Sequence, residues 1–447
     1  MIEKINIIFD ASILTYFFVK NHYMRSGIFF TAFNVLKELE KRQVFNITLL
    51  ISHDRYMFIK KMKKDPFFSK FTYIKIYDER QLIYRNEYIK LYKNKIRKNY
   101  NLLLKFFYLL KILKYFLYIF SYNINYNINE KFHSKTFNNI ISDTNVFFSP
   151  DSFIYYKIKF FTHIQKYNIL YDTMPLLYPK YYTNDFYTND HITEYANRHS
   201  LSKEYYYFCI SECTKHDFLK YHSNQIDEKK MIVTHIASSQ IFYPDYDKIK
   251  LAKTLYKYKV KHNNNDKYIF SLCTLEPRKN LVFTVKCFIK FIKKHNIDNF
   301  YFYLGGGQWD FFIHQLEEQI NSFDEYRNKI VRLGYIDDED VNILYSNSLF
   351  FTYISQYEGF GIPPLEAMQT GTPVITSNNS SLPEVVGDAA IMIDYDSEEQ
   401  CIKAFEDLYF NEDLRKHYME KGLERAKLFS WEKTIDKITK VIIENAT

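Results

Sequence analysis

The chain has 447 residues, of which 47% are hydrophobic and 25% are charged, a composition typical of folded, soluble proteins. This length exceeds one ordinary core and predicts two or three domains. The formal net charge of +8 is compatible with anionic nucleotides or an anionic membrane surface. Because the sequence has no zinc-finger spacing and no RNP-like motif, nucleic acid is not an expected partner.

The cysteines and the first residues indicate the cellular compartment. Five cysteines, an odd number at scattered positions, give no disulfide framework and predict a reducing environment. Cys209 and Cys213 are close, but no second pair of ligands follows them, so a metal site is not expected there. Residues 1–12 are strand-like, too short and too acidic for a signal peptide, and we therefore expect a cytoplasmic protein.

The first half of the chain contains apolar runs that predict strands, and one clear helix. A strand over 5–12 is followed by a glycine-led helix over 25–41. The block 84–130, rich in Lys, Tyr, Leu and Asn, is predicted to be an insertion. Further apolar runs that end in polar residues or proline lie at 47–52, 145–150, 167–175 and 205–212.

From Lys267 onward, predicted strands and helices alternate regularly. Such alternation is typical of a parallel doubly wound sheet, in which the loops at the carboxyl ends of the strands form the ligand crevice. Four motifs occupy such ends, namely "EPRKN", "GGGQWD", "GYIDDED" and "YEGFGIPP". The strands are predicted over 267–274, 300–307, 329–336, 349–355, 373–378 and 390–396.

Residues 357–374, "YEGFGIPPLEAMQTGTPV", predict a tight loop between a buried strand and a short helix. Pro363 and Pro364 fit the first helical positions, where a missing N–H costs little. Such a loop can aim backbone N–H groups at a phosphate, while Glu358 and Glu366 accept hydrogen bonds from sugar hydroxyls. The alternative is that Glu366 only complements the helix dipole, worth about 0.3–1 kcal/mol, and that Glu358 is an exposed loop residue.

The loop 274–280, "TLEPRKN", places two cations just before a predicted helix. Arg278 offers fork-like contacts and Lys279 a point charge, so the pair can clamp a diphosphate. The alternative is a solvated basic loop. By contrast, "LGGGQWD" at 304–310 is a poor dinucleotide fingerprint, because Asp310 stands where the third glycine should fall, and it predicts a close strand-to-helix turn.

Together these motifs resemble the retaining glycosyltransferases of family 4. "SLCTLEPRKNL" is similar to the family's Gly-Thr-x-x-x-Arg-Lys-Asn loop, and residues 357–390 are similar to its Glu-x7-Glu block. "VRLGYIDDEDVNILY", "ISECTKHDF" and "FSWEKT" also resemble family segments, and the resemblance is strong from Tyr268 to Trp431. "MRSGIFF" and "YDTMPLLYP" resemble mannosyl- and rhamnosyltransferase-like members that build bacterial surface polysaccharides.

The resemblance implies an α/β protein with two facing Rossmann-like doubly wound domains, the GT-B fold. The expected N-terminal domain is 1–243, which binds the acceptor and carries a helical insertion around 84–130. The expected C-terminal domain is 244–430, which binds the sugar nucleotide. The last helix, 431–447, is expected to cross back onto the N-terminal domain.

The resemblance also implies roles for residues of the two loops. Arg278 and Lys279 bind the diphosphate, and Glu366 bonds the ribose. Glu358, followed by the donor-binding Gly359, meets hydroxyls of the transferred sugar.

Other donor contacts follow from the same resemblance. The backbone N–H groups of Phe360 and Gly361 lie close to the transferred sugar. Gly27 lets a loop of the N-terminal domain approach the diphosphate. Tyr335 and Ile336 line the pocket for the base.

Two positions depart from the family pattern. Cys273 stands where the family usually has glycine, which places the backbone slightly farther from the donor. Tyr171 stands where many relatives carry histidine, so a histidine contact near the sugar is in doubt. Asp172, the next residue, either touches the acceptor or caps a turn.

The implied function is a retaining transfer of a hexose, mannose-like by the best match, from a nucleoside-diphosphate sugar to a saccharide or lipid-linked saccharide acceptor. The leaving phosphate helps to deprotonate the acceptor, which requires clamped leaving-group charge rather than a protein nucleophile. No cofactor and no metal are expected. The alternatives are an inactive sugar-nucleotide-binding or scaffold protein, and a sugar-nucleotide epimerase of similar architecture.

Residues 101–122, "NLLLKFFYLLKILKYFLYIFSY", are almost apolar enough to span a membrane. Lys105, Lys111 and Lys114 interrupt them and, at roughly 2.5–3.5 kcal/mol per central lysine, cancel most of the favourable insertion. With the basic stretch 93–98 upstream, the segment can instead rest at the inner face of a membrane. The alternative, favoured by the spread of the lysines around the helix, is packing inside the N-terminal domain.

Overall fold

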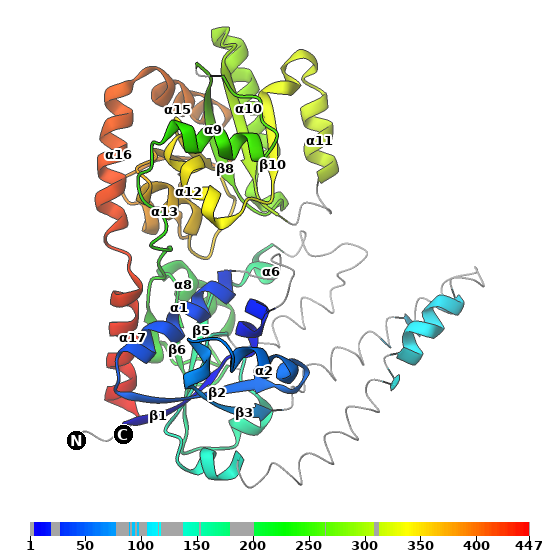
Figure 1. Cartoon of the computed structure of the whole chain (residues 1–447), viewed down its shortest axis with the longest axis vertical. Helices are drawn as coiled ribbons and strands as arrows, with labels where there is room; N and C mark the ends of the chain where they lie inside the picture. Colours follow the sequence, from blue (N-terminus) through cyan, green and yellow to red (C-terminus); the bar gives the residue numbers. More distant parts are fainter. Residues whose placement is uncertain are drawn as a thin grey trace. The chain divides into compact units, whose positions relative to one another are not determined.

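The computed structural model describes residues 4–18, 27–76, 137–178 without 152, and 201–446 without 264 and 308–312, together with short helical pieces between 89 and 117 (Figure 1). Two compact units divide the chain. The first comprises 1–168 with 439–447, and the second comprises 169–438. The domain boundary expected after residue 243 and the return of the last helix to the N-terminal domain stay predictions.

The first sheet has seven strands in the order β3-β2-β1-β4-β5-β6-β7. Pairing is parallel from β3 to β5 and between β6 and β7. Because both faces of a parallel sheet are covered, its strands are continuous apolar runs, and all four residues of β4 are buried. The strands are β1 (Ile5–Asp10), β2 (Phe45–Ser52), β3 (Thr72–Ile76), β4 (Val146–Ser149), β5 (Gln165–Leu170), β6 (Tyr206–Cys209) and β7 (Met231–Val233).

Helices connect these strands, and the glycine-led helix is confirmed as α1 (Gly27–Lys41). Its buried residues include Phe29, Val35, Leu36 and Leu39, which recur at helical spacing. Shorter helices follow the other strands. They are η1 (Ser12–Phe18), η3 (His53–Phe58), α2 (Ile59–Met62), η4 (Phe68–Lys70), α5 (Tyr156–Lys159), α6 (Met174–Leu177), α8 (Glu212–His222) and η6 (Glu228–Lys230).

The second sheet has six strands in the order β10-β9-β8-β11-β12-β13, and all its pairings are parallel. The strand order reverses between β8 and β11, and in doubly wound sheets the ligand binds beyond the carboxyl ends of the strands at such a reversal. The loops after β8 and β11 therefore begin at the reversal, where a ligand would be expected to bind. The strands are β8 (Lys267–Leu272), β9 (Phe300–Gly305), β10 (Ile330–Gly334), β11 (Phe351–Tyr353), β12 (Val374–Ser377) and β13 (Ile391–Ile393).

The helices around this sheet follow the predicted alternation. In α10 (Leu281–His295), Leu281, Val285, Phe288 and Ile292 are buried on one face. Side-chain oxygens cap α8, α9, α15 and α16 at their first turns. The remaining elements are α9 (Lys248–Lys257), η7 (Pro277–Lys279), α11 (Ile313–Asn321), η8 (Asp324–Lys329), α12 (Asp338–Ser346), α13 (Ile362–Gln369), α14 (Leu382–Val386), α15 (Glu398–Phe410), α16 (Glu412–Ala426) and α17 (Trp431–Asn445).

The structure confirms the predicted fold class, two doubly wound parallel sheets with helices between their strands. The five cysteines are free. Within the described ranges, no helix combines the length and the apolar content that crossing a membrane requires.

Candidate functional site

The two predicted cations lie in the loop after β8. Pro277 opens the short turn η7, and Asn280, in the left-handed conformation (φ 59°), leads the chain into α10. The side chains of Arg278 and Lys279 are only 16% and 7% exposed. This burial contradicts the alternative of a solvated basic loop.

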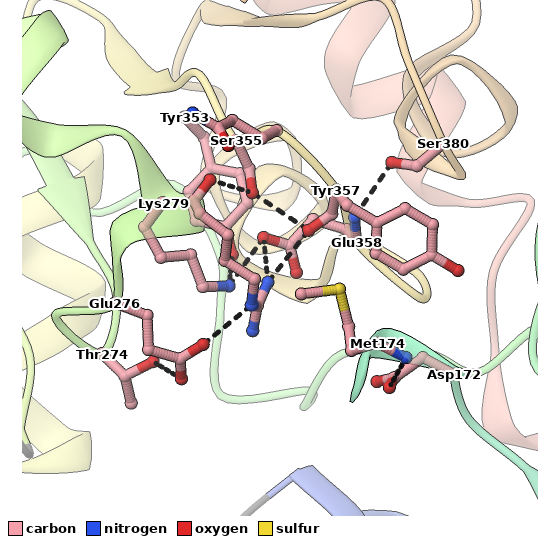
Figure 2. A network of polar contacts seen from close by, with 12 residues as sticks. Asp172, Met174, Thr274, Glu276, Lys279, Tyr353, Ser355, Tyr357, Glu358 and Ser380 are labelled. Atoms are coloured by element: carbon pink, nitrogen blue, oxygen red, sulfur yellow. Dashed lines mark hydrogen bonds and ion pairs between the residues drawn. The ribbon is translucent and has the colours of Figure 1, made fainter. Parts of the chain in front are cut away.

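One carboxylate oxygen joins the two cations. Glu358 Oε1 lies 2.6 Å from Lys279 Nζ and 2.9 Å from Arg278 Nη1. Arg278 Nε also lies 2.7 Å from Glu276 Oε2, and Lys279 donates a hydrogen bond to the hydroxyl of Tyr353 (2.5 Å; Figure 2). Buried charges are tolerated only when they are paired in this way. We call Glu276, Arg278, Lys279 and Glu358 the ion cluster.

The environment of Glu358 keeps its carboxylate ionised. The residue is buried, which contradicts the alternative of an exposed loop position. Burial opposes ionisation, but the charges of Arg278 and Lys279 outweigh it and lower the pKa of Glu358 to about 2. The cluster is therefore a set of opposite charges held together at neutral pH.

Serines that were not predicted hold the Glu358 loop in place. The N–H of Glu358 donates to the hydroxyl of Ser380 (3.0 Å), and Ser381 donates to the carbonyl oxygens of Glu358 and Phe360 (2.9 and 2.5 Å). Ser380 has a left-handed backbone (φ 51°). The motif "NNSS" before α14 was the available signal, because Asn and Ser are typical of turns whose side chains bond the backbone.

Gly359 lets the Glu358 loop contact the segment after β5. A Cβ at Gly359 would lie 2.7 Å from the carbonyl oxygen of Tyr171 and 3.1 Å from Cβ of Asp172. Ser211, the N-cap of α8, donates to the carbonyl of Gly359 (2.7 Å), and Thr214 donates to that of Tyr171 (2.6 Å). Glycine is therefore required here by packing, independently of any ligand.

Asp172 lies beside the ion cluster and also caps a turn. The N–H of Met174 donates to Asp172 Oδ1 (3.1 Å), as the turn-capping interpretation expected. Burial raises the pKa of Asp172, while that N–H and the charge of Arg278 oppose the rise. Contact with an acceptor stays a prediction.

Tyr357, the residue before Glu358, anchors this loop to α8. Its hydroxyl donates to Asp217, and Tyr178 packs against its ring with centroids 5.8 Å apart. Cys213 Sγ lies 3.6 Å from Asp217 Oδ2, so the nearby cysteine forms part of this polar group. The sequence pointed to this segment only through "ISECTKHDF", because Asp217 and Tyr357 are 140 positions apart.

The first turn of α13 offers few backbone N–H groups that could bind an anion. The ring of Phe360 packs against His235 and Phe429, with centroids 6.1 and 5.7 Å away, so the Phe360 side chain serves packing. Gly361 has φ 128°, a conformation that favours glycine. Because the prolines at 363–364 lack an N–H, the donors for an anion at this end come from the backbone just before them.

Glu366 has an environment opposite to that of Glu358. The hydroxyl of Tyr345 in α12 donates to Glu366 Oε2 (3.0 Å). Burial raises the pKa of Glu366 to about 8; the Tyr345 hydrogen bond opposes this rise and Asp338 adds to it. The side chain is thus mostly neutral at neutral pH, and a neutral group does not complement a helix dipole.

The predicted base-pocket residues follow β10. Tyr335 is 36% exposed and Ile336 is buried. A Cβ at Gly305 would lie 2.3 Å from Ile336 Cδ1, and one at Gly306 (φ 138°) would lie 1.7 Å from the carbonyl oxygen of Cys273. The two glycines at the end of β9 therefore permit a close turn against Cys273 and Ile336. Asp310 lies outside the described residues.

Gly27 begins α1 in the first unit. A Cβ at this position would meet no heavy atom within 4 Å, so packing does not require glycine there. Its approach to a diphosphate stays a prediction.

Among the described residues, one group of acidic side chains has metal-like spacing, namely Asp337, Glu339 and Asp340. Lys257 Nζ lies 2.8 Å from Asp337 Oδ2 and 2.5 Å from Asp340 Oδ2. One ammonium group therefore already pairs with two of these three carboxylates.

Sequence comparison matches part of the chain to a known family. Residues 253–425 match the family described as glycosyl transferases group 1. The chain is 31% identical over 226 residues to the O-antigen chain mannosyltransferase B of Escherichia coli, a match that covers 50% of this chain and 56% of that relative. The chain thus spans little more than half the length of that relative.

Solved structures share the fold. A glycosyltransferase from Rickettsia africae ESF-5 superimposes with a TM-score of 0.63 at 18% identity, over 99% of this chain and 98% of that one. HepE of Anabaena, solved with UDP and glucose, gives 0.61 at 12% identity, over 98% of this chain and 100% of that one. At such identities the likeness shows the fold alone, which is the two-domain GT-B fold.

The raised pKa of Glu366 predicts a pH dependence of stability. The folded state holds the Glu366 proton up to about pH 8, whereas the unfolded chain releases it near 4.5, so Glu366 lowers stability progressively as pH rises between these values. Without nucleotide, Glu366→Gln should raise the free energy of unfolding by on the order of 2 kcal/mol at pH 8 and by little near pH 5. The gain at pH 8 is smaller than the full pKa shift would give, because water partly screens the half-buried side chain.

Urea unfolding of the wild type and the variant across this pH range measures the difference. Glu420→Gln, at an exposed position on α16, is the matched control and should show no such trend. A constant difference between Glu366→Gln and wild type at every pH would contradict the prediction.

Proposed function

Because residues 253–425 match the group 1 glycosyltransferases, we propose that this protein moves a hexose from a nucleoside-diphosphate sugar to a saccharide acceptor, with retention of configuration. We take the hexose to be mannose-like and the product to be a bacterial surface polysaccharide, in keeping with the named E. coli relative. The observation that carries the proposal is the ion cluster, where two buried cations and a buried carboxylate meet at the strand reversal of the second sheet.

In this proposal the cations stabilise the leaving group. Breaking the bond between the sugar and the phosphate leaves negative charge on the diphosphate, and preorganised cations in a buried site stabilise such charge strongly. Arg278 and Lys279 are already buried and oriented, so little rearrangement is needed. The departing phosphate oxygen accepts the proton of the acceptor hydroxyl as that oxygen bonds to the sugar on the same face.

The two acidic residues divide the recognition of the donor. Glu358 stays ionised and accepts hydrogen bonds from hydroxyls of the transferred sugar. Glu366, mostly neutral at pH 7, accepts and donates hydrogen bonds with the ribose. Its neutrality removes the repulsion that a second carboxylate would exert on the diphosphate.

The charge of the ion cluster sets the order of events on binding. Two cations and two carboxylates sum to zero, so a diphosphate must displace a carboxylate from Arg278 to gain its full attraction. The Glu276 side chain is 34% exposed, whereas that of Glu358 is 10% exposed. Glu276 can move into water, and Glu358 stays to orient the sugar.

We further propose that the transfer needs no metal and that the acceptor is a lipid-linked saccharide met at the inner face of a membrane. Protein cations take the place that a divalent ion has in other transferases. An inactive sugar-nucleotide-binding protein and a sugar-nucleotide epimerase are the alternatives that experiments must separate.

The direct test begins with a panel of nucleoside-diphosphate sugars. The true donor should raise the melting temperature most, because it binds the folded state alone. With an oligosaccharide acceptor added, free nucleoside diphosphate should be released in buffer that contains EDTA. Binding without acceptor-dependent release identifies the inactive binder, and a new sugar nucleotide formed without acceptor identifies the epimerase. Loss of activity in EDTA that manganese restores contradicts metal independence.

Removing one cation should slow the chemical step. We expect Lys279→Ala to lower kcat on the order of a hundredfold at saturating donor, comparable to the loss of one preorganised donor to a developing charge. Lys416→Ala, at an exposed position on α16, is the matched control and should leave kcat unchanged. Unchanged turnover of the Lys279 variant would exclude its role at the leaving group.

The two carboxylates of the cluster should respond differently to neutralisation. Glu358→Gln leaves the buried Lys279 without its carboxylate partner, while Arg278 keeps Glu276, and should lower the free energy of unfolding by about 3 kcal/mol. A nucleoside diphosphate supplies the missing negative charge, so it should raise the melting temperature of this variant more than that of the wild type. Transfer should still be impaired.

Glu276→Gln is the matched comparison. Because the Glu276 side chain is partly exposed, its loss should cost little stability and should tighten nucleoside diphosphate binding in calorimetric titration. Glu366→Ala should instead weaken that binding. Equal losses of nucleotide affinity in the Glu358 and Glu366 variants would contradict the division between sugar and ribose.

A further inference from the structure

A helix in the first unit exposes an apolar side. Residues 105–114 and 116–117 are helical and lie in the cyan part of the chain (Figure 1). Its exposed apolar side chains, each between 46% and 59% exposed, are Phe106, Phe107, Leu109, Leu110, Leu113, Phe116 and Leu117. A helix packed inside a domain buries such residues, so the packed alternative is wrong for these positions.

The exposed residues form one stripe. Phe106, Leu109, Leu110, Leu113 and Leu117 follow the spacing of three and four residues that places side chains along one face of a helix.

The opposite side of the same helix makes contacts within the chain. Ile112 is buried, and the ring of Tyr108 stacks on that of Tyr92 with centroids 5.6 Å apart. This helix therefore packs through a minor face and presents its major apolar face outward.

Basic residues border the stripe. At 100° per residue, Lys114 and Lys105 each lie about 40° beyond opposite edges of the stripe. Lys111 lies farther round the helix, with its Nζ 5.3 Å from the ring centroid of Tyr92. Lys93 Nζ lies 5.9 Å from the ring centroid of Phe116, which adds a cation near the end of the stripe. The segment 105–117 contains no acidic residue. An apolar stripe bordered by cations is the pattern of helices that lie in the plane of a membrane interface.

We propose that the helical residues 105–114 and 116–117 dock this protein on the surface of a membrane that contains anionic phospholipid. Its leucines and phenylalanines enter the boundary between headgroups and acyl chains, and its lysines reach the phosphates with their flexible stems.

Charge selects this occupant over the others. Two copies of the helix in contact would bring their lysines together without a balancing acid, which opposes a dimer through this face. A spanning orientation would bury the three lysines in hydrocarbon, and no helix among the described residues meets the requirements for a span. An anionic surface matches both the stripe and its basic border.

Flotation of the full-length chain with vesicles tests the proposal without donor or acceptor, so the outcome does not depend on the proposed transfer reaction. Wild type should float with vesicles of phosphatidylglycerol and phosphatidylcholine in equal parts. Binding should be weaker at high salt and much weaker to phosphatidylcholine alone. A wild type that stays unbound to the mixed vesicles overturns the proposal.

Three double variants separate the contributions. Leu110→Glu with Leu113→Glu removes the stripe, and Lys105→Glu with Lys114→Glu reverses its border; each pair should lower the vesicle-bound fraction roughly tenfold. Lys60→Glu with Lys64→Glu changes the net charge by the same amount at exposed positions of the same unit, and should bind like wild type. Equal losses in all three pairs would show a general charge effect and overturn the proposal.

Melting temperature distinguishes docking from packing. Because the mutated leucines are exposed, the Leu110 and Leu113 double variant should have the melting temperature and the circular dichroism spectrum of the wild type. A large fall in melting temperature means that the stripe packs in a core. Light scattering that shows a wild-type dimer, converted to a monomer by the same pair, means that a second copy covers the stripe. Either result overturns the proposal.

Discussion

The candidate site depends on one buried carboxylate shared by two buried cations. Removing Glu358, Arg278 and Lys279 from water is costly, and only close pairing in fixed geometry offsets the cost. That requirement constrains the loops at the carboxyl end of the second sheet. The loops after β8 and β11 have to contact each other, and the turn before α14 has to hold the Glu358 backbone. The glycine, serine and aromatic contacts around the Glu358 loop all help to hold these two loops together.

The same chemical group behaves in opposite ways eight positions apart. Cations lower the pKa of Glu358 to about 2, whereas burial without a cation raises that of Glu366 to about 8. A diphosphate placed between them would meet one carboxylate already neutralised by its partners and one carboxyl group that is mostly uncharged. The sequence alone posed the difficulty of two acids beside a phosphate, and their environments remove it.

Much of the fold and part of the site could be predicted, for identifiable reasons. Strand and helix periodicity is local, so the alternation after residue 267 and helices such as α10 were visible in the sequence. Arg278, Lys279 and Glu358 stood out because their motifs lie at strand ends. Tyr353 and Ser381 did not, since a tyrosine in an apolar strand and a serine in a turn are ordinary locally, and their contacts join distant segments. The exposure of the apolar stripe within 105–117 could not be predicted either, because periodicity shows which residues share a face but not what covers that face.

In the proposed function, the ion cluster is a neutral site that must attract an anion. Its four charges cancel, so long-range attraction is weak until one carboxylate moves. Glu276 accepts a hydrogen bond from the Thr274 hydroxyl and has partial access to water, so hydration compensates its departure. Glu358 has no such access, and its departure would strand a charge in the protein interior. In the proposed function, this asymmetry in burial, rather than any difference in chemistry, makes Glu276 the residue that admits the phosphate and Glu358 the residue that stays beside the sugar.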